Sequence, residues 1–145
     1  MTCSYLVNAQ IPEKEKQYLI DFNNSTFGEQ WQRKWDLKSD PATWHGVEVA
    51  NGHVVGLKLY RNNLTGAIPD GISALSHLKS LNLAFNVIEG ELPKDLFSLQ
   101  KLSSLRLEMN KISGTLPQDF SKMAALEELS MFNNLFQGEI PDGIG

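Results

Sequence analysis

Cysteine is nearly absent from this chain of 145 residues: Cys3 is the only one, so no disulfide can form within the chain. Metal centres built on several thiolates, such as structural zinc and iron–sulfur sites, are excluded for the same reason. No stretch approaches the ~18 consecutive apolar residues that a transmembrane helix needs, so we expect no membrane span. The net charge is −4 with both signs interspersed. The broad basic surface that binds nucleic acid is therefore missing.

Residues 1–16 also lack the apolar run of about 7–15 residues that a secretory signal contains. We therefore expect a chain that stays inside the cell, or else a mature or trimmed form. The remaining composition suits one folded domain, because 41% of the residues are apolar and can form a core.

The dominant pattern is a regular sequence repeat that begins at Val54. Four leucines, four asparagines, four glycines and four prolines fall in register at one constant spacing: Leu57, Leu81, Leu105 and Leu129; Asn62, Asn86, Asn110 and Asn134; Gly66, Gly90, Gly114 and Gly138; Pro69, Pro93, Pro117 and Pro141. A fixed period in the range of about 20–50 residues predicts a solenoid, in which each coil buries its apolar face against its neighbours.

Each repeated residue type has an expected structural role. The Leu-x-Leu pairs, such as Leu57 and Leu59, should point inward from short strands that stack into a parallel sheet. The asparagine amide can donate and accept at once, so we expect it to bind the backbone of its own and adjoining coils. The proline should lie on the returning side, where no strand pairing is needed.

The residues before the repeats predict a cap. We divide the chain into a loose N-terminus (residues 1–11), an N-terminal cap (12–53) and four repeats (54–145), the last one incomplete. Pro12 should begin a helix that ends near Ser25, and Trp31, Trp35 and Trp44 should cover the first coil. Alternating apolar residues on both sides of Asn51-Gly52 predict a hairpin, whose first strand covers the sheet edge.

The repeat pattern resembles a known family. Residues 78–93, LKSLNLAFNVIEGELP, are similar to the plant-type leucine-rich repeat, and residues 35–49 resemble the N-terminal cap of those proteins. The resemblance implies an α/β repeat fold: a right-handed leucine-rich-repeat solenoid with the parallel sheet on its concave face. Members of this family include receptor-kinase ectodomains and polygalacturonase-inhibiting proteins. They bind proteins, peptides or small hormones, usually on the concave face.

One departure from the family pattern bears on location. Family caps usually carry two bridged cysteines, where this chain has Ala42 and Val49. A reducing compartment would permit that loss, so we expect a cytoplasmic protein, with an extracellular one as the alternative.

The outward strand positions and the adjoining turn are the candidate binding surface. Their four basic residues (Lys58, Arg61, Arg106 and Lys111) and two acidic ones (Glu108 and Glu128) give a net charge of +2. They also carry exposed aromatic side chains of the kind that binding hot spots favour. We therefore expect a protein or peptide partner that is acidic and partly apolar. A merely solvated face is the competing interpretation. The predicted partner-binding residues are Lys58, Tyr60, Arg61, Asn82, Phe85, Arg106, Glu108, Met109, Ser130 and Phe132.

The sequence offers little for catalysis, and we predict neither an enzyme nor a cofactor or metal site. His45, His53 and His77 are scattered, although His45 and His53 could form a surface pair across the hairpin. Three functions stay open: a non-catalytic interaction scaffold, a piece of an extracellular recognition protein (a receptor ectodomain or a hydrolase inhibitor), and a structural spacer. The chain ends without a polar closing segment, which predicts a partly bare apolar end at Leu126, Leu129, Met131, Phe136 and Ile144. A truncated array, end-to-end self-association or a tolerated rough end would each explain it.

Overall fold

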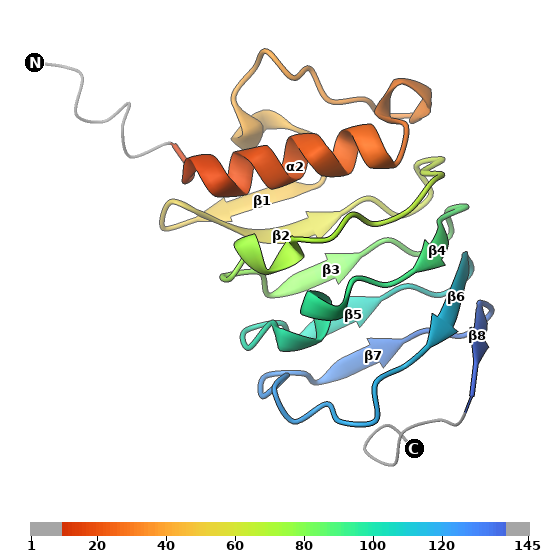
Figure 1. The fold of residues 1–145 in the computed structure, drawn as a ribbon. Helices are drawn as coiled ribbons and strands as arrows, with labels where there is room; N and C mark the ends of the chain where they lie inside the picture. The colour runs from red at the N-terminus through yellow and green to blue at the C-terminus, as the bar shows by residue number, and fades with distance from the viewer. Residues whose placement is uncertain (1–9, 139–145) are drawn as a thin grey trace, which may run out of the picture.

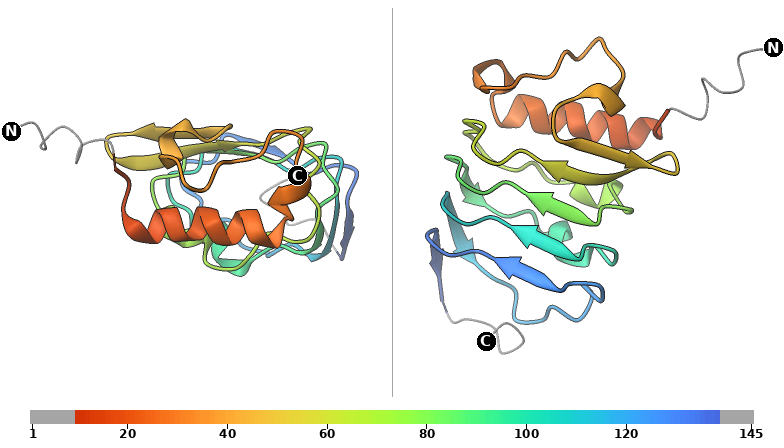
Figure 2. Two further views of the ribbon diagram at one scale, coloured as in Figure 1. Left: turned by 90° about the horizontal axis from the view of Figure 1, so that it is seen from above. Right: turned by 180° about the vertical axis from the view of Figure 1, so that it is seen from behind.

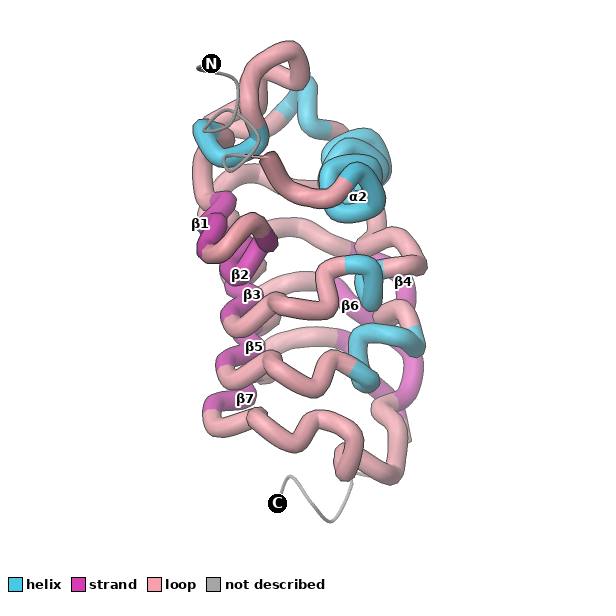
Figure 3. Tube along the Cα trace, turned by 90° about the vertical axis from the view of Figure 1, so that its left-hand side faces the viewer, coloured by secondary structure: helices cyan, strands magenta, loops and turns pink. Residues whose placement is uncertain are grey.

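A computed structural model describes residues 10–138, which wind into a flattened solenoid of stacked coils (Figure 1). Strands line two sides of the stack, and short 3-10 helices lie on another (Figure 3). The predicted loose terminus, residues 1–11, falls almost entirely outside the described residues, as does Ile144 of the predicted bare end. The predicted solenoid with a parallel sheet and a helical cap is confirmed.

Sheet A forms one side of the solenoid. Across residues 10–138 it has five strands in the order β1 (Val47–Ala50), β2 (His53–Lys58), β3 (Ser80–Asn82), β5 (Ser104–Arg106) and β7 (Glu128–Ser130). The last four run parallel, and Leu57, Leu81, Leu105 and Leu129 pair in one row. The first three of these leucines are fully buried. Neighbouring residues of a strand point to opposite faces, so the residues between the leucines point outward.

The hairpin closes the first edge of sheet A. β1 pairs antiparallel with β2 through a turn at Asn51 and Gly52, whose φ values are 52° and 77°. Positive φ at both central residues is the type I′ pattern that asparagine and glycine favour. β2 begins at His53, so the hairpin crosses the boundary that we predicted between cap and repeats. That boundary stays a prediction.

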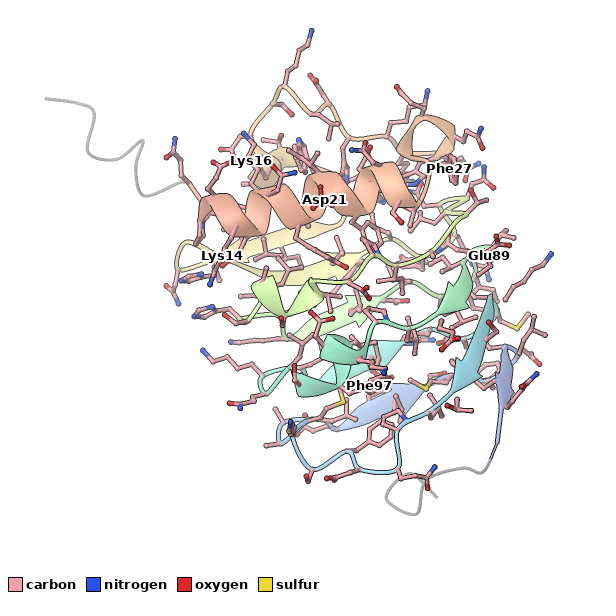
Figure 4. The ribbon with its side chains drawn as sticks, viewed as in Figure 1. Lys14, Lys16, Asp21, Phe27, Glu89 and Phe97 are labelled. Atoms are coloured by element: carbon pink, nitrogen blue, oxygen red, sulfur yellow. The ribbon has the colours of Figure 1, made fainter. Side chains whose placement is uncertain are left out.

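A second parallel sheet, which we did not predict, lines another side of the coils. Within the described residues, sheet B consists of β4 (Glu89–Glu91), β6 (Lys111–Thr115) and β8 (Leu135–Gln137). Its register pairs Glu89 with Lys111, which is two positions short of the spacing that pairs Leu81 with Leu105 in sheet A. Ile88 and Ile112 anchor these segments in the core, each 1% exposed. Figure 4 shows Glu89 on β4, at the right-hand side of the molecule in that view.

Four 3-10 helices occur in the part of the chain that the structure describes: η1 (Gly28–Gln30), η2 (Pro41–Thr43), η3 (Ile72–Ala74) and η4 (Lys94–Ser98). η3 and η4 lie one above the other on the returning side of successive coils. Phe97 of η4, labelled in Figure 4, packs edge-on against Phe120 of the next coil, with ring centroids 5.4 Å apart. Pro69, Pro93 and Pro117 lie outside both sheets, as predicted.

The repeated asparagines bind the coils to one another. The Asn86 amide nitrogen donates to the carbonyls of Leu59, Leu83 and Ala84 at 3.0–3.2 Å. Its side-chain oxygen accepts the N–H groups of Asn62 and Leu64 at 2.9 and 3.0 Å. Asn110 and Asn134 repeat the arrangement one and two coils later. The predicted role of these asparagines is confirmed.

The cap consists of one long helix and a stack of tryptophans. Helix α2 (Glu13–Ser25) lies across the first coil and contacts η3 (Figure 2, left). Trp31 meets Trp35 edge-on and Trp35 stacks on Trp44, each pair with ring centroids 4.9 Å apart. All three are at most 6% exposed, and their indole N–H groups donate to backbone carbonyls. This confirms the predicted tryptophan-rich cover over the first coil.

Two glycines provide a matched test of how closely α2 approaches the first coil. Gly66 and Gly52 have similar φ values, 73° and 77°. A Cβ on Gly66 would overlap the carbonyl oxygen of Ser25, whereas on Gly52 it would meet nothing nearer than the Gln10 carbonyl oxygen at 3.8 Å. Gly66→Ala should therefore lower the free energy of unfolding by more than about 2 kcal/mol, and Gly52→Ala by about 1 kcal/mol. Urea unfolding measures both, and equal losses would contradict the close approach.

Candidate functional site

The outward face of sheet A, with the turn that follows each strand, carries a row of large exposed side chains. We call this surface the outer face (Figure 2, right). Tyr60 and Phe132 are 54% and 59% exposed, and Phe85 and Met109 are each 37% exposed. Single exposed apolar residues are common on proteins, but four in neighbouring coils form a continuous candidate contact surface.

The backbone presents these side chains in a fixed way. Arg61, Phe85, Met109 and Asn133 occupy the same position of successive coils, and all four have φ between 51° and 62°. Their left-handed conformation costs roughly 1 kcal/mol each for residues that carry a Cβ. The first three are held by N–H donation to the next coil, as from Arg61 to the Ala84 carbonyl at 3.1 Å. The turn residues of successive coils are therefore stacked in the same register as the strands.

Side chains within the row also contact one another. The Arg61 guanidinium lies over the Phe85 ring, 4.3 Å from its centroid. At the other end, the Asn133 amide donates to the Met109 sulfur at 2.9 Å. These contacts restrict the rotamers before any partner arrives, which reduces the entropy that binding would cost.

Ion pairs neutralise much of the predicted positive charge. The Lys58 ammonium lies 3.1 Å from the carboxylate of Glu48, which is on β1 and was not among the predicted residues. The Arg106 guanidinium lies 2.5 Å from the Glu108 carboxylate. Adding Glu48 to the face reduces its net charge from the predicted +2 to +1. Among the described cations of the predicted surface, Arg61 and Lys111 have no carboxylate partner, and Lys111 is the first residue of β6 in sheet B.

Glu108 departs from its predicted place, because it is only 1% exposed and cannot offer its side chain to a partner. Burial opposes its charged form, but hydrogen bonds from Arg106 and Ser130 outweigh burial and hold the pKa of Glu108 below its ordinary value. The same hydrogen bond between the two side chains raises the pKa of Arg106. Four other predicted residues are half-buried, and each is the last residue of its strand: Lys58, Asn82, Arg106 and Ser130.

A small pocket adjoins the outer face at its cap end. It has a volume of about 240 Å³ and is lined by Gln32, Arg33, His45, Tyr60, Arg61 and Asn62. Burial and the nearby Arg33 charge lower the pKa of His45. A neutral imidazole, a phenol and two guanidinium groups therefore surround one cavity, and sequence reasoning did not bring Gln32, Arg33 and His45 to this place.

His45 does not pair with His53, contrary to expectation. The hairpin register places His45 beside the end of β2, whereas His53 begins that strand. His53 instead stacks on His77, with ring centroids 3.6 Å apart and planes inclined by 11°. These two histidines are separated by one repeat period, so the period itself was the signal that could have found the pair.

At the far end of the described residues, five apolar side chains and two asparagines surround a second cavity. Leu116, Leu129, Met131, Phe132, Asn133, Asn134 and Phe136 line a volume of about 330 Å³. Leu126, Leu129, Met131 and Phe136 are half-buried. Residues 139–145 follow directly and lie outside the described part, so self-association through this end stays a prediction.

Comparison with known proteins places the repeats in context. The family described as Leucine Rich Repeat matches residues 77–99, 101–123 and 125–145. Among curated proteins, none matches this chain.

Solved structures with similar folds are plant receptor ectodomains. The LRR ectodomain of the receptor kinase SOBIR1 from Arabidopsis thaliana superposes with a TM-score of 0.73 at 25% identity, over 93% of this chain and 87% of that one. The PEPR1–AtPEP1 structure gives 0.76 at 23% identity, over 92% and 20%. The plant peptide hormone receptor RGFR1 in complex with RGF2 gives 0.60 at 30% identity, over 70% and 19%. The chain thus spans most of SOBIR1's ectodomain but only about a fifth of the chains in the other two structures.

These similarities do not support the expected cytoplasmic location, since the SOBIR1 structure is described as a receptor-kinase ectodomain. None of the helices in residues 10–138 has the length and apolarity that crossing a membrane requires.

Proposed function

Because this chain is a plant-type leucine-rich-repeat protein, we propose that it is a non-catalytic scaffold that binds a protein or peptide on the outer face of sheet A. The observation that carries the proposal is the row of exposed Tyr60, Phe85, Met109 and Phe132, held in register beside Arg61. Aromatic, methionine and arginine side chains are the residue types enriched in the cores of binding interfaces.

The pocket at the cap end supports a partner with an acidic group. Arg33 and Arg61 line it together with Tyr60. Guanidinium groups can bind a carboxylate with two parallel hydrogen bonds, and the phenol can add a third donor. The ion pairs at Lys58 and Arg106 leave this end of the face as the place where added negative charge is best accommodated.

The exposed row beyond the pocket supports a partner whose acidic residue is followed by apolar residues. Strands lie about 4.8 Å apart, so the step from Arg61 to Phe132 over three strand spacings covers about 14 Å. An extended peptide advances about 3.3 Å per residue, so roughly four to five residues would cross the row. We propose a short segment whose acidic residue enters the pocket and whose apolar side chains contact Phe85, Met109 and Phe132.

Size sets the expected affinity. The described strands of sheet A form a face of roughly 400 Å², about half of the ~800 Å² per partner in a standard interface. A short peptide bound here should therefore have a modest affinity. The exposed residues next to the row, Val87 at 39% and Leu135 at 59%, would extend the contact for a larger partner.

The test is selection of peptides from a random library on the immobilised chain. We expect enriched sequences with an acidic residue followed by aromatic or aliphatic ones. Phe85→Asn removes the ring while asparagine tolerates the left-handed backbone. It should weaken the selected peptides at least ~10-fold, equivalent to about 1.4 kcal/mol.

Phe27 offers a matched control for that experiment. It is 53% exposed and has φ of 57°, like Phe85, but it lies in the cap near the C-terminal end of α2 (Figure 4). Phe27→Asn should leave the affinity within about twofold. Equal losses in the two variants, or no loss in Phe85→Asn, would contradict binding at the outer face.

A piece of an extracellular recognition protein is the second candidate, and the similarity to the SOBIR1 ectodomain over most of both chains favours it. It is compatible with the same binding face. A parent gene that encodes an apolar leader before this segment or a kinase after it would support the candidate. A parent gene with neither would favour the cytoplasmic scaffold.

A further inference from the structure

A cluster of three side chains lies where strands β2 and β3 begin, at the opposite end of these strands from the cap-end pocket: Glu15, His53 and His77. Each offers a ligand atom, and these atoms lie within 4.8 Å of one another. They come from three separate elements: α2, the first residue of β2, and the turn before β3. Neither the proposed peptide contact nor the asparagine network uses any of the three side chains.

The repeat brings the two histidines together. Gly56 pairs with Ser80 in sheet A, so His53 and His77 occupy the same position of successive coils. Helix α2 runs over this edge and supplies Glu15 from above. Three residues that are far apart in the sequence therefore lie together, because the repeat aligns the two histidines and α2 passes beside them.

Glu15 is fixed and leaves one histidine nitrogen free. Its side chain is fully buried. One carboxylate oxygen accepts the Val54 N–H at 2.7 Å, and the other lies 2.7 Å from Nδ1 of His53. In the neutral tautomer that donates its Nδ1–H to this carboxylate, Nε2 of His53 carries a lone pair. Histidines that bind metal ions through one nitrogen typically donate the other N–H to a carboxylate in this way.

We propose that His53 and His77 bind a divalent transition-metal ion of the class that imidazole prefers, such as zinc, nickel or copper, while Glu15 orients His53. Nε2 of His53 is one ligand, an imidazole nitrogen of His77 is the second, and water completes the coordination. The two rings are stacked, so the lone pairs on their nitrogens lie in nearly parallel planes. The His77 ring must therefore turn before both nitrogens can face the same metal ion. His77 lies in a half-buried turn, and its one side-chain hydrogen bond among residues 10–138 is a 3.4 Å contact to Ser76 Oγ, so turning the ring breaks that contact and the stacking on His53.

The surrounding charges moderate the affinity. Lys14 and Lys101 both act on His77 electrostatically, and Lys14 projects from the first turn of α2 (Figure 4). Their positive charge opposes a cation, whereas the buried Glu15 favours it. The ion is therefore expected to bind reversibly at the surface, independently of the proposed function on the outer face.

Calorimetric titration of the full chain with zinc ions tests the site. The chain carries no polyhistidine tag, and a Cys3→Ser background removes the thiol as a ligand. We expect one ion per chain. His77→Ala should weaken binding at least ~10-fold, and Glu15→Gln by ~10–100-fold through the lost orientation of His53.

Two controls make the result decisive. His45→Ala removes the third histidine and should leave zinc affinity within about twofold, because His45 lies at the opposite end of the hairpin. Magnesium ions should not bind, since they prefer oxygen ligands. If Glu15→Gln fails to fold, the half-buried His77→Ala variant still decides the question. The proposal is overturned by absence of zinc binding, by an equal loss in His45→Ala, or by equally tight magnesium binding.

Discussion

Replacing Asn86 by alanine is expected to lower the free energy of unfolding by about 3–5 kcal/mol, because several buried backbone groups lose their partner at once. The side chain makes five hydrogen bonds to backbone groups of its own and the preceding coil. Asn86 is 9% exposed, so water cannot easily replace the lost partners. Each buried backbone group left without a partner costs about 1–3 kcal/mol, and partial relaxation of the coil reduces the sum.

Urea unfolding followed by circular dichroism measures this loss. Asn24→Ala is the matched control, because Asn24 is exposed on α2 and none of the side-chain hydrogen bonds among the described residues involves it. It should change stability by no more than about 0.5 kcal/mol, as surface substitutions usually do. A loss below about 1 kcal/mol in Asn86→Ala, the size of a single ordinary hydrogen bond, would show that the asparagine row does not hold the coils together.

The period of the sequence determines most of this fold, since it fixes which residues are neighbours in space. Once Leu57 and Leu81 are separated by one period, their pairing in a parallel sheet and the burial of both follow from stacking alone. The asparagine contacts follow for the same reason. The hairpin at Asn51-Gly52 was predictable because its turn demands positive φ at two successive residues.

Sheet B could not be predicted from the same pattern. β4 and β8 are only three residues long, and β6 is five. Their exposed residues follow no single type: β4 carries Glu89 and Glu91, whereas β6 carries Lys111 and Thr115. The pairing of Glu89 with Lys111 is also out of step with the repeat. Such strands form because the coil has already placed the two backbone segments side by side, so their own residues carry little signal.

The position of the candidate site could be predicted from the sequence. The net charge of this face and the exposure of its side chains could be predicted less well. The exposed aromatic residues follow from the alternation of the strands, as at Tyr60 and Phe132. The ion pair of Lys58 with Glu48 depends on the register between β1 and β2, which shifts next to Glu48. The burial of Glu108 depends on the packing of its side chain, which forms an ion pair with Arg106. Neither can be deduced from a period.

The cap must close the solenoid without the disulfide that the family resemblance leads one to expect. Ala42 and Val49 stand at those positions, so packing and hydrogen bonds carry the closure. Asn62 joins the first coil to the cap by accepting the Arg33 N–H at 2.7 Å and donating to its carbonyl. The contacts of α2 and the three packed tryptophans add to this closure, with Trp35 between Trp31 and Trp44.

Trp35→Ala is therefore expected to destabilise the protein by about 3–5 kcal/mol, the range for deletion of a buried aromatic ring. The substitution removes both ring contacts, to Trp31 and Trp44, and leaves the His45 carbonyl without its 2.8 Å hydrogen bond. Urea unfolding gives the loss, and hydrogen exchange should show that the amides of the cap open before those of the repeats.

Trp35→Phe separates ring packing from the hydrogen bond. It keeps an aromatic ring but loses the indole N–H, so a loss of about 1–2 kcal/mol is expected. Leu37→Ala, in the same segment but 37% exposed, should cost less than about 1 kcal/mol. If Trp35→Ala proves no more costly than Leu37→Ala, then the tryptophan stack is not what closes the first coil, and the contacts of α2 and Asn62 must suffice.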